Sequence, residues 1–144
     1  MKNLAIAAVI LATTSTTSEC GAELEKACTV LFRGLEIENG RVTDVLTPVC
    51  DPKPQIHKIQ AWIEYKNIGE WSPLGRRSPL AFTIPDKTGF PIKVTAPCLE
   101  GAYRSGYEVT GRGAALPDNP SGIPFKDKDY GWTTRIFSVG DCKG

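Results

Sequence analysis

The chain has 144 residues, with 17 Lys and Arg against 16 Asp and Glu, so its formal net charge is +1. It contains no block of like charge, which argues against nucleic acid as a partner. No internal repeat or composition shift marks a linker, and we therefore expect a single domain.

The N-terminus has the order of parts of a secretory signal peptide. Lys2 precedes an apolar run over residues 4–12, and a polar Thr/Ser stretch follows. This run is about half as long as the roughly 20 apolar residues that a membrane span requires. The small residues of Cys20-Gly21-Ala22 suit cleavage after Ala22. The sequence thus predicts a signal peptide over 1–22 and a secreted, extracellular domain over 23–144, with no membrane insertion after cleavage.

Four cysteines remain after this cleavage: Cys28, Cys50, Cys98 and Cys142. An even number in an exported chain predicts two disulfides, formed outside the cytoplasm. Neither CxxC pairs nor a histidine cluster accompany them, so we expect no metal and no cofactor. The nested pairing of Cys28 with Cys142 and of Cys50 with Cys98 is the simplest of three connectivities. A link between Cys28 and Cys50 would instead staple a hairpin.

Short runs rich in β-branched and aromatic residues survive between 14 glycines and 11 prolines, which interrupt candidate helices. Asn39-Gly40 separates the first two runs and suits the type I′ turn of a hairpin. Residues 57–65 alternate with strand period, with Trp62 as the exception on the polar face. The predicted strands are 28–37, 42–49, 57–65, 80–84, 92–98, one that follows Gly101 and carries Tyr103, Tyr107 and Val109, and 132–139.

A local motif narrows the fold. Gly101-Ala102-Tyr103 has the Gly-x-Tyr arrangement of a tyrosine corner, in which the phenol bonds back to the backbone at the turn into a late strand. About seven short strands with such a corner predict an all-β, immunoglobulin-like antiparallel β-sandwich with two disulfides.

The cysteine spacing resembles that of a group of small secreted proteins. The chain has an early Cys28, Cys50-Asp51-Pro52 leading into an alternating strand, Trp71 in the next loop, a Cys98–Arg104 segment and a terminal Cys142. This pattern is similar to disulfide-bonded secreted proteins of unassigned function from actinobacteria and their phages. The resemblance spans most of the mature chain, implies an exported β-sandwich and carries no catalytic residues over.

Catalytic chemistry finds little support. His57 is the single histidine, it falls on the apolar face of a predicted strand, and no Gly-x-Ser-x-Gly elbow exists. The mature cysteines are all expected to be bridged. Two pairs of carboxylates, Glu36 with Glu38 and Asp127 with Asp129, leave a glycan hydrolase as a minor alternative. We therefore expect a protein that is not an enzyme.

Two loops are candidate binding segments. Trp71, Arg76 and Arg77 bring side chains that are enriched in interaction hot spots. The stretch 111–130 is long for a loop and is predicted to bind a partner at the same end of the sandwich. Its candidate contacts are Leu116, Ile123, Phe125, Tyr130 and, at its exit, Trp132.

These features predict a monomeric, non-catalytic interaction module that acts through end loops on a protein or glycan at the cell envelope. The alternative is an inhibitor or phage-exclusion factor that presents the 111–130 loop. A general adhesion surface would lie instead on the sheet face around Trp62.

Overall fold

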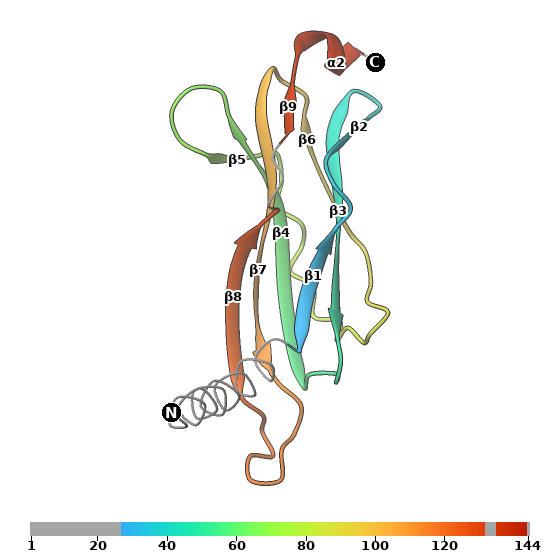
Figure 1. Cartoon of the computed structure of the whole chain (residues 1–144), viewed down its shortest axis with the longest axis vertical. Coiled ribbons are helices and arrows are strands. Elements are labelled where there is room, and N and C mark those ends of the chain that lie inside the picture. Colours follow the sequence, from blue (N-terminus) through green and yellow to red (C-terminus); the bar gives the residue numbers. More distant parts are fainter. Residues whose placement is uncertain (1–26, 132–134, 144) are drawn as a thin grey trace, which may run out of the picture.

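Two antiparallel sheets face each other in the computed structural model, which describes residues 27–131 and 135–143 (Figure 1). In the first, sheet A, two short strands pair with successive parts of one edge of a long strand, and a fourth strand pairs with its other edge. Sheet A contains β1 (Cys28–Phe32), β2 (Glu36–Glu38), β3 (Arg41–Cys50) and β6 (Ile92–Pro97).

Sheet B is built on the long pair β4 and β7, and its strands follow the order β5-β4-β7-β8, with β9 also paired to β7. Its strands are β4 (Ile56–Lys66), β5 (Ser72–Leu74), β7 (Gly101–Arg112), β8 (Pro124–Tyr130) and β9 (Arg135–Phe137). The short helix α2 (Val139–Lys143) follows β9. No helix within residues 27–131 and 135–143 has the length and apolar character needed to span a membrane.

The core lies between the sheets, where alternate residues of facing strands meet. Leu46 and Val94 from sheet A pack against Ile59 and Ile63 from sheet B, and all four are buried. Because side chains alternate along a strand, this contact fixes which residues of β4 and β7 point outward.

Two local predictions are confirmed. Asn39 and Gly40 have φ angles of 52° and 73° and form the two-residue turn of the β2–β3 hairpin. The hydroxyl of Tyr103 donates to Pro97 O (2.9 Å) and accepts from Leu99 N (2.6 Å), as a tyrosine corner requires.

The predicted strand over 80–84 is wrong. Within it only Ala81 pairs with β4, through an isolated bridge to Ile59, and Phe82 is 61% exposed. Pro79 and Pro85 flank this segment and have no N–H to donate, so a continuous ladder along the edge of β4 does not form.

The predicted loop over 111–130 is also largely wrong. β7 continues to Arg112 and β8 begins at Pro124, so the connection between them is the short segment 113–123. β8 is an edge strand with exposed charged residues at four successive positions, 126–129, so it has no apolar periodicity to reveal it. Of the last predicted strand, 132–139, residues 135–137 form β9 and Val139 begins α2, while residues 132–134, with Trp132, lie outside the described residues.

The two disulfides are present, but the nested pairing is wrong. The bonds join Cys28 to Cys50 and Cys98 to Cys142. β1 pairs directly with β3, which places Cys28 opposite Cys50 with 4.1 Å between their Cα atoms. The last strand, β9, pairs with β7 in the other sheet, so Cys142 in α2 meets Cys98 instead.

Candidate functional site

The outer face of sheet B carries an aromatic row across three strands. Trp62 of β4 lies beside Gly106 of β7, which in turn lies beside Tyr130 of β8. A Cβ atom on Gly106 would come within 2.9 Å of the Tyr130 ring and 3.0 Å of the Trp62 ring. The glycine therefore lets the two rings meet edge to face, with 6.5 Å between their centroids.

A second row of outward-pointing residues, two positions away along β4 and β7, is charged. Arg104 of β7 lies opposite Glu64 of β4 and donates to its Oε1 from Nε (2.9 Å) and Nη2 (2.7 Å). The Oε2 atom of Glu64 accepts from Trp62 Nε1 at 2.8 Å. Arg104 also stacks between two rings, with Cζ 3.7 Å from the Tyr130 centroid and 4.5 Å from the Trp71 centroid. Glu64 thus connects both rows.

Further cations cover Trp62 from the solvent side. The guanidinium carbon of Arg77 lies 4.2 Å from the Trp62 ring centroid, and Lys128 Nζ lies 5.8 Å away. Trp62 is consequently only 1% exposed although it is on the outer face. We call this set the stacked face: Trp62, Glu64, Trp71, Arg77, Arg104, Lys128 and Tyr130.

The charge of this outer face differs from that of the whole chain. Its outward positions on β4, β7 and β8, together with Arg77, hold seven basic side chains and two acidic ones. The basic ones are Lys58, Lys66, Arg77, Arg104, Arg112, Lys126 and Lys128, and the acidic ones are Glu64 and Glu108. A chain of nearly zero net charge therefore presents one strongly basic face.

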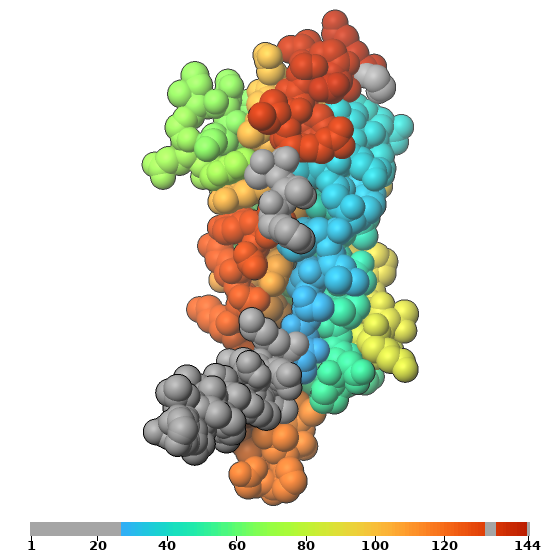
Figure 2. Space-filling view, viewed as in Figure 1, coloured from blue at the N-terminus to red at the C-terminus, as the bar shows by residue number. Residues whose placement is uncertain are grey.

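The two predicted binding loops lie at opposite ends of β4, so their predicted combination at one end is wrong. Ser72, next to Trp71, pairs with Tyr65 near one end of β4, whereas Gly111 pairs with His57 near the other. In Figure 2 the connection over 113–123 protrudes beyond the sheets at one end, and the loop before β5 protrudes near the other.

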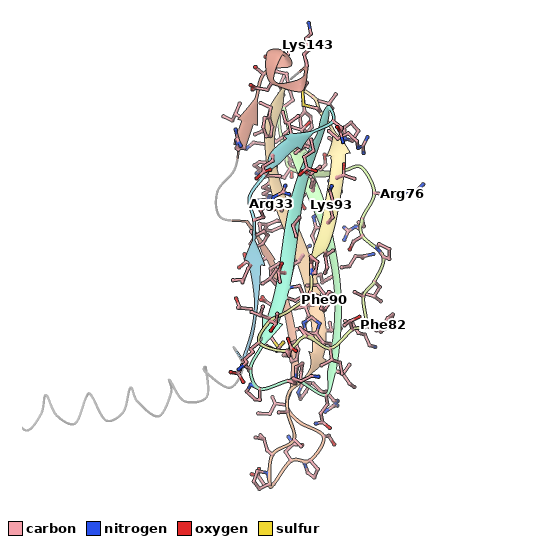
Figure 3. All side chains as sticks on the ribbon, turned by 90° about the vertical axis from the view of Figure 1, so that its right-hand side faces the viewer. Arg33, Arg76, Phe82, Phe90, Lys93 and Lys143 are labelled. Atoms are coloured by element: carbon pink, nitrogen blue, oxygen red, sulfur yellow. A yellow bond between two sulfur atoms is a disulfide. The ribbon has the colours of Figure 1, made fainter. Side chains whose placement is uncertain are left out.

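The predicted contact residues are accordingly divided among separate places. Trp71, Arg77 and Tyr130 belong to the stacked face, while Arg76 points away from the body of the protein (Figure 3). The remaining described ones are Leu116 and Ile123 in the 113–123 connection and Phe125, whose ring packs 6.2 Å from that of His57.

A cavity of about 390 Å³ lies between β1 and β8, the strands that end the two sheets on this flank. His57 lines it and is 2% exposed, and its Nδ1 has no hydrogen-bond partner among the described residues. Burial lowers the pKa of His57 to about 4, so the imidazole is neutral at pH 7. The Cys28–Cys50 disulfide lies beside this ring.

The carboxylate pairs are occupied by neighbouring groups. Glu38 accepts from Lys93 Nζ at 2.9 Å and lies 3.2 Å from Arg33 Nη1, and Glu36 lies 3.6 Å from Arg33 Nε. The hydrogen bond from Lys93 is the main reason that the pKa of Glu38 is lowered. Asp127 accepts from the Tyr107 hydroxyl at 2.9 Å, and burial raises the pKa of that phenol.

Sequence reasoning missed Glu64, Arg104 and Lys128. The sequence did hold a clue. Trp62 and Glu64 are two residues apart and so point to the same face of their strand, and the same is true of Lys128 and Tyr130. The order of the strands was also needed to bring these positions together. Comparison with protein-family models, curated proteins and solved structures finds no match for the chain.

Proposed function

We propose that this protein is an exported, non-catalytic binding module that engages an anionic partner at or outside the cell envelope through the outer face of sheet B. The observation that carries this proposal is the stacked face, where cations lie on aromatic rings above a single buried carboxylate. Charge complementarity to such a surface accelerates encounter and selects the partner.

The stacked face holds its cations in place before any partner arrives. Arg104 is fixed by two rings and by Glu64, and Arg77 rests on Trp62. The Nε–Nη2 edge of Arg104 is bonded to Glu64, so Arg77, stacked on Trp62, is the guanidinium whose N–H edge is offered to a carboxylate, sulfate or phosphate group. Preorganised side chains lose less conformational entropy on binding than free ones do.

The fold proposed for the module is the immunoglobulin-like sandwich. β1 and β2 follow one edge of β3 as one interrupted strand, and β8 and β9 do the same along β7. Counted this way, the nine short strands reduce to seven, three in sheet A and four in sheet B. The tyrosine corner on β7 supports the same fold.

Binding of the purified protein to immobilised heparin, a sulfated polysaccharide, and to immobilised polyglutamate tests the proposal. We expect retention on at least one of them that weakens as salt is added, because these contacts are exposed. Arg77→Gln combined with Lys128→Gln should weaken retention about tenfold or more. The matched control on sheet A, Arg41→Gln combined with Lys93→Gln, should not. Equal losses in both variants, or no retention of the wild type, would refute it.

A second candidate is an inhibitor that inserts the 113–123 connection into a partner. This segment is braced by its own backbone, since Leu116 and Asn119 exchange hydrogen bonds of 3.0 Å. Gln55 Nε2 also donates to Gly113 O (3.1 Å) and Pro120 O (3.0 Å). Such bracing is what a rigid inhibitory loop needs.

Shortening this connection discriminates the two candidates. Replacing residues 115–120 by a two-residue Asn-Gly turn should leave the sheets folded and retention on the polyanion unchanged if the stacked face binds. Loss of retention with an unchanged circular dichroism spectrum would favour the inserted loop.

A further inference from the structure

Three atoms with metal-binding character gather beside the cavity between β1 and β8. The Sγ atoms of Cys28 and Cys50 and a ring nitrogen of His57 lie within 4.8 Å of one another. Cys50 and His57 are buried, and Cys28 is partly exposed. The sulfurs are joined in the oxidised protein and are not metal ligands in that state.

The fold keeps these groups together without the disulfide. Cys28 and Cys50 are opposite residues in the five-residue pairing of β1 with β3. Hydrogen bonds from Cys50 N to Asp86 O (2.9 Å) and from Asp51 N to Ala27 O (3.0 Å) hold the same end of the pair. We therefore expect β1 and β3 to stay paired when reduction releases the two sulfurs from each other.

His57 can supply a nitrogen ligand for a metal ion. Its Nδ1 is buried and has no hydrogen-bond partner in the described part of the chain, which is an unfavourable state for a polar atom. The ring is neutral at pH 7, as metal coordination requires. The cavity lined by Cys28 and His57 gives an ion and a small reductant a route to this place.

We propose that reduction of the Cys28–Cys50 bond creates a three-coordinate site for Cu⁺, formed by the two thiolates and the His57 imidazole. Thiolates are soft ligands and favour Cu⁺, and three ligands fall one short of the four that Zn²⁺ takes in structural sites. A dithiol donates two electrons and two protons to the disulfide and becomes a disulfide itself. Cu⁺ then displaces the two thiol protons, and the metal does not change its oxidation state.

The Cys98–Cys142 disulfide provides an internal control, because His57 lies beside the Cys28–Cys50 disulfide. The full exported chain carrying Cys98→Ser and Cys142→Ser is reduced with dithiothreitol and freed of it under nitrogen. It is then titrated with Cu⁺ against a chromophoric Cu⁺ chelator. We expect one equivalent to bind, and His57→Gln in the same background should bind at least about tenfold more weakly.

Two further measurements keep the inference falsifiable. The variant with Cys28→Ser and Cys50→Ser, which retains Cys98 and Cys142, should bind no better than the His57→Gln protein. X-ray absorption of the loaded protein should show two sulfurs and one nitrogen around copper. Equal affinity with and without His57, ligation by sulfur alone, no uptake of Cu⁺, or loss of the β-sheet dichroism on reduction would each overturn the proposal.

Discussion

The outer faces of the two sheets differ in the groups that their cationic side chains contact. On sheet A, Lys93 and Arg33, which are labelled in Figure 3, both pair with Glu38, so these two cations lie against a carboxylate of the same sheet. On sheet B, Arg104 and Arg77 lie on aromatic rings, and Glu64 is the carboxylate beneath them. Arg104 is paired with Glu64, but the outward cations of sheet B outnumber its two carboxylates, so sheet B presents the larger excess of positive charge to a partner.

Among the substitutions that test this comparison, replacing Trp62 should cause the largest loss of stability. Trp62→Ala removes a ring that is 1% exposed and leaves Arg77 and Lys128 without their support. We expect a loss of about 3–5 kcal/mol of unfolding free energy, measured by urea denaturation. Phe82→Ala, at a ring that is 61% exposed, serves as the control and should cost far less. Equal losses of unfolding free energy in the two variants would mean that the stacked face does not stabilise the fold.

The buried His57 should make the free energy of unfolding depend on pH, without changing the outer face of either sheet. His57 has a pKa of about 4 when folded and 6.5 as its ordinary value, so the unfolded chain binds a proton first as pH falls. The free energy of unfolding therefore falls as pH drops from 6.5 to about 4, and this group causes no further loss below that range. The total is about 3 kcal/mol.

Urea denaturation at several pH values between 7 and 4 measures this loss. The His57→Gln protein should have a flatter profile over the same range, while both proteins keep the same retention on the polyanion at pH 7. An unchanged slope in the variant would assign the pH dependence to other groups.

The Glu64 carboxylate should show an intermediate effect. It is 7% exposed and accepts from both Trp62 and Arg104. Glu64→Gln keeps the size of the side chain but removes the charge that strengthens its three hydrogen bonds, and its amide nitrogen cannot accept one, with an expected cost of about 2 kcal/mol. Glu108→Gln on the same face is the matched control. A more stable Glu64→Gln protein would contradict the proposed role of Glu64 in joining the two rows.

The smallest effect is expected on sheet A. Lys93 bonds to Glu38 across an exposed surface, where salt bridges contribute little to stability. Lys93→Ala should leave the urea midpoint unchanged within error, and retention on the polyanion should be the same as for the wild type. A clear loss of either would mean that sheet A is not the passive face of the comparison.

Local chemistry made part of this protein predictable. Asn39-Gly40 specifies its turn because both residues tolerate positive φ, and Gly101-x-Tyr103 specifies its corner because the phenol reaches only nearby backbone. The strand over 57–65 was readable because one of its faces is buried. The edge strand β8 was not readable, since its exposed charges give no apolar period.

By itself, the sequence determined the all-β class and the two disulfides, and it singled out Trp71, Arg77 and Tyr130 as candidate binding contacts. Only the tertiary structure decided which cysteines meet, because pairing depends on strand order and β1 joins β3. The same holds for the stacked face. Its residues are isolated in sequence and become neighbours because β4, β7 and β8 align in register, which no local pattern records.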